Sequence, residues 1–110
     1  MNNRGSQADV EAQCRAWLRD GRVTVARAQV RWSENWDTKQ ITVTGSLGIA
    51  PDEHTIILYP ISISRFGHWG KTQLRREMAA VKRELIAAMK ERGYWSLRCR
   101  GRIEIKSLRP

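Results

Sequence analysis

Arginine recurs at every second position near the C-terminal end of this 110-residue chain. The series is Arg98, Arg100 and Arg102, and Lys106 continues it with the same parity. Alternation with period two is typical of a β-strand, on which residues i and i+2 stand about 6.6 Å apart on one face. That distance is close to the ~6–7 Å between successive phosphates of one nucleic-acid strand. The pattern predicts a cationic row that can follow a phosphate backbone.

The same row has a structural interpretation, because edge strands are commonly protected from aggregation by charge. Lysine is the usual residue for that purpose, whereas the planar guanidinium of arginine matches a phosphate group. Arginine outnumbers lysine fifteen to five in the whole chain, so a coding bias explains part of the preference. Both interpretations remain open on the sequence.

A second basic group falls on a helix expected over residues 72–92. Arg76, Arg83 and Lys90 lie seven residues apart, and a glutamate follows each of them directly. A solvated helix face of mixed charge explains this pattern as well as a phosphate-binding strip does. Lys71, Arg75 and Arg76 also surround the expected start of the helix, where free N–H groups favour anions. The segment is not a Walker A motif, which requires a glycine where this chain has Arg65.

Aromatic residues supply the other candidates for contact with a partner. Trp36 falls in a polar loop over residues 33–38, and we expect it to be exposed and available for stacking. Arg27 and Arg31 lie on the strand before this loop, beside Trp32, which shares the parity of the core. The aromatic residues of a second loop are expected to cover one end of the core; they are Phe66, His68 and Trp69.

Catalysis and metal binding find little support in the sequence. Asp52, Glu53 and His54 are adjacent in a turn, whereas a nuclease needs carboxylates that converge from several elements. Cys14 and Cys99 form no metal-binding spacing and are expected to be buried thiols. We expect no enzyme activity, no cofactor and no metal ion.

Composition favours a single folded basic domain over residues 1–110, with a flexible N-terminus at 1–6. The net charge is +9 and 41% of residues are hydrophobic. Residues 71–110 hold twelve cationic and four acidic side chains, so they carry nearly all of the excess charge. No apolar run reaches the ~18 residues of a membrane span, and no secretory signal is evident. We therefore expect a cytoplasmic protein that does not bind membranes.

Periodicity gives the expected elements. Helices are predicted over 7–19 and 72–92, and strands over about 26–32, 41–49, 55–64 and 95–106. Pro60 within the third strand indicates an edge position or a bulge. The fold class is α+β, with the order α-β-β-β-α-β, a four-stranded antiparallel sheet and both helices packed on one face.

This layout resembles that of the double-stranded RNA-binding domain. Arg75-Arg76-Glu77 followed by Ala79-Ala80 is similar to the Lys-Lys-x-Ala-Lys helix start of that family. The alanine is displaced here, and an additional strand follows the helix. The similarity is one of layout and assigns no family.

The function expected from these residues is non-enzymatic binding of nucleic acid through the phosphate backbone. The alternative is a small protein-interaction or inhibitor module, such as a phage or mobile-element accessory, that offers the same surface to an acidic protein. The sequence does not indicate an oligomeric state, and it does not separate DNA from RNA. The candidate binding residues are Arg27, Arg31, Trp36, Lys71, Arg75, Arg76, Arg83, Arg98, Arg100, Arg102 and Lys106.

Overall fold

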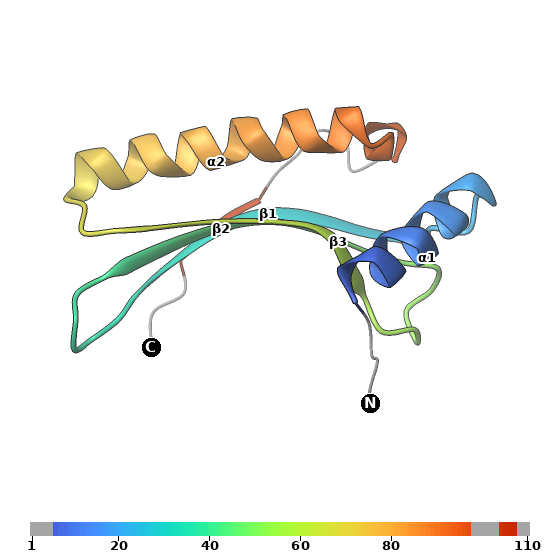
Figure 1. The fold of residues 1–110 in the computed structure, drawn as a ribbon, viewed down its shortest axis with the longest axis horizontal. Helices are drawn as coiled ribbons and strands as arrows, with labels where there is room; N and C mark the ends of the chain where they lie inside the picture. Colours follow the sequence, from blue (N-terminus) through green and yellow to red (C-terminus); the bar gives the residue numbers. More distant parts are fainter. Residues whose placement is uncertain (1–5, 98–103, 108–110) are drawn as a thin grey trace.

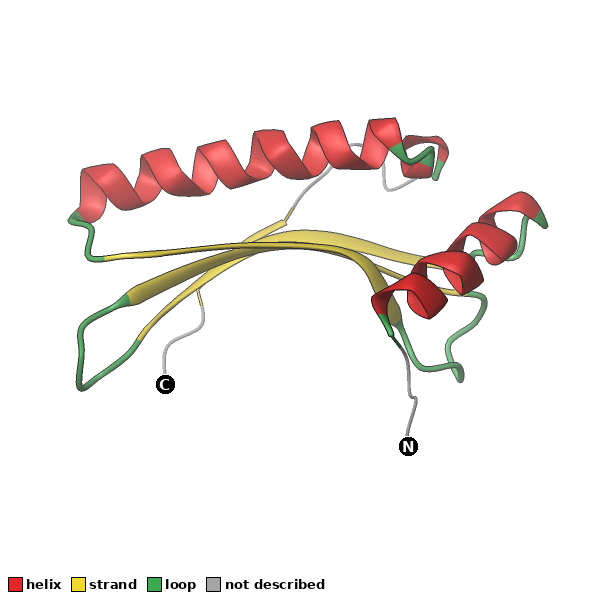
Figure 2. Ribbon diagram, in the orientation of Figure 1, coloured by secondary structure: helices red, strands yellow, loops and turns green. Residues whose placement is uncertain are grey.

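A computed structural model describes residues 6–97 and a strand at 104–107 (Figures 1 and 2). The chain has an α+β architecture in which three antiparallel strands and two helices form the main body. In chain order the elements are α1 (Gln7–Arg19), β1 (Val25–Glu34), β2 (Ile41–Ala50), β3 (Leu58–Gly67), α2 (Lys71–Glu91), η1 (Tyr94–Ser96) and β4 (Glu104–Ser107).

The strand order across the sheet is β3-β2-β1-β4. β2 pairs antiparallel with both β1 and β3, but the short β4 pairs parallel with β1. The prediction of a wholly antiparallel sheet is therefore wrong at its last strand. The reason is that α2 runs back along the sheet from the end of β3 (Figure 1). A strand that follows such a helical crossover runs in the same direction as the strand before it.

Both helices pack on one face of the sheet, where the core lies. The buried side chains of α2 share one apolar cluster with Cys14 and Trp17 of α1 and with alternate residues of the strands. Gly45, at the centre of β2, lies directly beneath α2. A Cβ atom at this position would stand 2.6 Å from Cγ1 of Val81, so only glycine allows this approach.

The predicted helix ends are confirmed. Ser6 Oγ accepts a hydrogen bond of 3.2 Å from the backbone N–H of Asp9, which caps α1. Gly21 and Gly93 have φ values of 66° and 83°, the left-handed conformation that follows a helix at low cost in glycine.

The third strand begins three residues later than predicted, because Asp52 organises the turn before it. Its Oδ1 accepts hydrogen bonds from the backbone of His54 and Thr55 and from the Thr55 hydroxyl. The expectation from Pro60 is confirmed, since β3 lies at the sheet edge and its pairing with β2 shifts register near this residue. The alternation of the sequence places Tyr59 on one face with Ile61 and Ile63, and the shift moves it to the other face.

The last predicted strand is shorter than expected. Trp95 lies in the 3-10 turn η1, which follows the left-handed Gly93 and closes with a hydrogen bond from Leu97 N–H to Tyr94 O. Among the described residues, the pairing with β1 runs over Glu104–Ser107. Cys99 and residues Arg98, Arg100 and Arg102 lie outside the described residues.

Candidate nucleic-acid interface

The predicted binding residues of β1 and α2 fall on two opposite sides of the sheet. Arg27 and Arg31 of β1 alternate with the core residues Ala28 and Val30, and so lie on the face away from the helices. Lys106 of β4 pairs with Arg31 in the parallel register. The other group lies on the solvent-exposed side of α2 and consists of Lys71, Arg75, Arg76 and Arg83. The basic residues of β1 and those of α2 therefore belong to two separate surfaces.

We call the sheet face away from the helices the open face. Its side chains come from alternate positions of three strands, and none of those positions in β1, β2 or β3 is acidic. The residues of the open face are Arg27, Gln29 and Arg31 on β1, Thr42, Thr44, Ser46 and Gly48 on β2, and Tyr59, Ser62, Ser64 and Phe66 on β3. Both helices lie on the other side of the sheet (Figure 2), so the two arginines meet no carboxylate from either helix.

The centre of the open face holds two buried polar atoms whose hydrogen bonds are not made. Nε of Arg31 and Oγ of Ser46 have no partner within the described residues. Ser46 pairs with Gln29 and Arg31 pairs with Thr44, so the two side chains are diagonal neighbours on adjacent strands. A buried polar atom without a partner costs about 1–3 kcal/mol.

Two aromatic rings flank this polar centre, and sequence reasoning placed neither of them there. Phe66 pairs with Thr42, and its side chain is 61% exposed. The expectation that it covers the core is therefore wrong. Tyr59 is 41% exposed, and its ring packs where a Cβ on Gly48 would stand. The signal that was missed is Gly48 itself, a glycine inside a strand that marks the close approach of another group.

Trp36 is exposed, as predicted, at the hairpin that joins β1 and β2. Nζ of Lys39 lies 5.4 Å from the centroid of its ring, in a cation–π contact. Asn35 holds the loop, because its Oδ1 accepts hydrogen bonds from the backbone N–H groups of Asp37 and Thr38. His68 Nε2 also contacts Thr38 O at 3.2 Å, which links this hairpin to the segment before α2.

Arg65 of β3 pairs with two of the glutamates of α2, Glu77 and Glu84, which therefore do not neutralise the basic residues of the helix. Its guanidinium donates to Oε2 of Glu84 and stands 3.8 Å from Oε1 of Glu77. Binding to Glu84 raises the pKa of Arg65 above its ordinary value. Among the described residues, the basic side chains of α2 at 71, 75, 76, 82 and 83 form no ion pair. This compensation was visible in the sequence, since Arg65 shares the parity of the core residues Ile61 and Ile63.

Local contacts shift the pKa values of two ionisable groups, Asp52 and Cys14. Hydrogen bonds from the Thr55 hydroxyl and the His54 backbone lower the pKa of the Asp52 carboxyl. Its Oδ1 therefore stabilises the turn before β3. Burial raises the pKa of the Cys14 thiol to about 11, and Glu11 adds to the shift. Cys14 forms no disulfide. Over residues 6–97, no three His, Cys, Asp or Glu side chains gather as ligands for a metal ion.

No protein-family model matches the chain, and a match is found neither among curated proteins nor among solved structures. In the part of the chain that the structure describes, neither helix is long and apolar enough to cross a membrane.

Proposed function

We propose that the protein binds single-stranded nucleic acid across the open face, with arginines on the phosphates and aromatic rings on the bases. The observation that supports this most strongly is the charge of the open face: Arg27 and Arg31 have no acidic partner among the described residues. The exposed rings of Tyr59 and Phe66 lie on the same side of the sheet. Proteins that bind single strands combine a cationic track with aromatic side chains on which bases stack.

The spacing of the residues fits such a ligand. Arg27 and Arg31 are four residues apart on β1, which corresponds to about 13 Å and so to about two phosphate steps. Tyr59 and Phe66 are seven residues apart on β3, or about 23 Å, enough for three to four nucleotides between them. The strand would therefore lie along β1, with its bases directed over β2 toward the rings of β3.

The arginine row near the C-terminus would extend the same track. β4 lies beside β1, and Lys106 is in register with Arg31. Arg98, Arg100 and Arg102 directly precede this strand in the sequence. Their contact with phosphate stays a prediction.

The test is fluorescence anisotropy with a labelled 12-nucleotide single strand and the matching duplex, each at 50 and 200 mM salt. The variant Arg27→Gln/Arg31→Gln is compared with Arg75→Gln/Arg76→Gln, which removes the same charge from the opposite side of the molecule. We expect the first variant to weaken single-strand binding at least tenfold, and the salt slope to fall by about 1.4 for two lost phosphate contacts. Phe66→Ala should weaken binding about 5-fold to 100-fold, the value of one stacked base.

Three outcomes would contradict the proposal. Loss of binding in the α2 variant alone would move the interface to the helix. Tighter binding of the duplex, with no effect of Phe66→Ala, would exclude base stacking. Absence of binding to any oligonucleotide would favour the acidic protein partner, for which the exposed Trp36 is a suitable anchor.

A further inference from the structure

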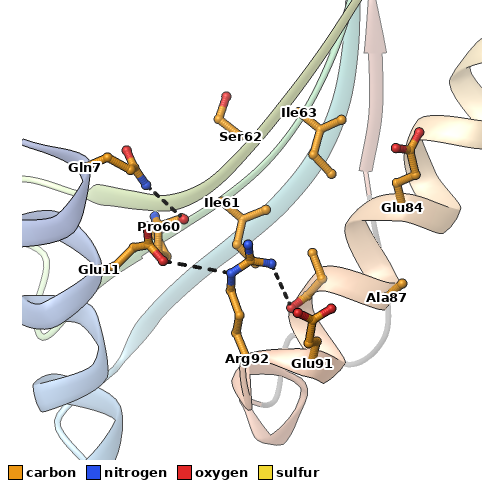
Figure 3. A pocket seen from close by; sticks show the side chains of 11 residues that line it. Gln7, Glu11, Pro60, Ile61, Ser62, Ile63, Glu84, Ala87, Glu91 and Arg92 are labelled. Carbon is orange, nitrogen blue, oxygen red and sulfur yellow. Dashed lines mark hydrogen bonds and ion pairs between the residues drawn. The ribbon is translucent and has the colours of Figure 1, made fainter.

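A groove of about 620 Å³ lies on the other side of β3, between the two helices (Figure 3). Its floor is apolar and consists of Ile61 and Ile63 of β3. Glu11 of α1 forms one wall, and Glu84, Ala87 and Glu91 of α2 form the other. Neither the sequence patterns nor the proposed function account for this space.

The charge of the groove is opposite to that of the whole protein. Three carboxylates and one arginine line it, although the net charge of the chain is +9. The arginine, Arg92, already contacts protein groups. Its Nε stands 4.0 Å from Oε1 of Glu11, and its Nη1 donates a 3.5 Å hydrogen bond to Ala88 O. Glu91 is exposed and forms no ion pair within the described residues, so its carboxylate is available.

The groove also runs beside a free sheet edge. β3 is the outermost of the described strands, so its outer backbone groups have no partner strand among them. Gln7 shows that such a group is accessible from the groove, because its side-chain amide donates a 3.1 Å hydrogen bond to Pro60 O (Figure 3). Edges of this kind bind extended polypeptide segments.

We propose that this groove binds an extended segment of a partner protein that carries aliphatic and basic side chains. The aliphatic side chains would cover Ile61 and Ile63, and a long basic side chain would reach Glu91 at the rim, since Glu84 is already bound by Arg65. Carboxylates repel phosphate, so the occupant differs from the ligand of the open face. The proposal does not depend on nucleic-acid binding.

The test uses three fluorescein-labelled peptides, (Val-Lys)4, (Val-Glu)4 and (Gly-Lys)4, in anisotropy titrations of the full chain. The overall charge of +9 attracts the acidic peptide, so a preference for (Val-Lys)4 can only come from a local acidic site. We expect (Val-Lys)4 to bind at least tenfold more tightly than either of the other two.

The site is assigned with Ala87→Arg, which places a bulky cation on the wall of the groove. Its matched control is Ala79→Arg, an exposed position on the same helix that does not line the groove. We expect Ala87→Arg to weaken (Val-Lys)4 at least tenfold and Ala79→Arg to change it less than twofold. Oligonucleotide affinity should be equal in the two variants, which separates this site from the open face.

Three results would overturn the proposal. The first is tighter binding of (Val-Glu)4, and the second is an equal effect of the two arginine variants on (Val-Lys)4. The third is a dimer in light scattering that dissociates in Ala87→Arg alone, since this would assign the groove to a second copy of the chain. Circular dichroism of both variants confirms that each is folded before the comparison is made.

Discussion

The two sides of β3 differ in what covers them and in how their charges are compensated. Ile61, Ile63 and Arg65 face the helices, and there the arginine is bound by Glu84 and Glu77. Ser62, Ser64 and Phe66 face the open side, where Arg27 and Arg31 of β1 have no acidic partner among the described residues. The net charge of the chain therefore says little about either surface, and the positions of the compensating groups decide what each can bind.

The largest difference between the two faces should appear in stability. Leu85 is fully buried under α2, and Leu85→Ala should lower the free energy of unfolding by about 2–5 kcal/mol through loss of packing and a residual cavity. Phe66→Ala should change it by less than about 0.5 kcal/mol, because the ring is mostly exposed. Urea denaturation measures both. Comparable losses would show that Phe66 belongs to a packed core and is not free for a ligand.

A smaller difference is expected at two glycines of β2. An added Cβ would stand 2.6 Å from Val81 at Gly45 and 2.7 Å from Ile57 and Tyr59 at Gly48. Val81 is fully buried and cannot move, so Gly45→Ala should cost about 1–3 kcal/mol through overpacking. Tyr59 is partly exposed and can turn aside, so Gly48→Ala should cost less than half as much in the same denaturation experiment. A larger cost at Gly48 would indicate that Tyr59 is fixed.

The buried thiol of Cys14, on the face of the sheet that the helices cover, makes the stability of the protein depend on pH. Because the folded pKa of Cys14 is about 11, raised from 9.0, the folded state binds the proton more tightly. Its contribution to stability is complete below pH 9 and is lost as the pH rises toward 11, by about 1 kcal/mol at pH 10.

Thermal or urea unfolding between pH 8 and 11 checks this expectation. Tyr94, whose pKa burial also raises, adds to the same loss. In a Cys99→Ser background, Cys14 is the one remaining thiol. Cys14→Ala in this background should flatten the dependence of stability on pH only in part. An unchanged profile in Cys14→Ala would assign the whole effect to other groups.

Much of the fold could be predicted because its signals are local. Ser6, Gly21 and Gly93 mark helix ends through interactions within a few residues, and both helices were placed within one residue at each end. Pro60 indicated the edge position of β3 for a similarly local reason. The direction of β4 could not be predicted from local signals, because it depends on how α2 crosses the sheet before the chain returns to β1.

The candidate surfaces were predicted less well for physical reasons that can be named. Tyr59 changed face because the register shift at Pro60 interrupts the period of two, so its parity with Ile61 was misleading. Trp36 was placed correctly, as it lies in a loop with turn-forming neighbours. The groove depends on the angle between α1 and α2, and no sequence period encodes that angle.

A small effect on stability is also expected at Arg65, the residue that separates the charges of the two faces. Arg65→Gln removes both ion pairs, which are largely exposed, so the free energy of unfolding should fall by less than about 1 kcal/mol, and less again at high salt. The released carboxylate of Glu84 lines the groove, so (Val-Lys)4 should bind several-fold more tightly. Binding of the single strand at 200 mM salt should stay within twofold of the wild-type affinity, because Arg65 faces the helices.

Arg19→Gln, which removes an equal charge at the end of α1, is the control for net charge. Equal effects of the two variants on peptide binding would mean that the overall charge of the protein, and not the local position of Arg65, governs the groove.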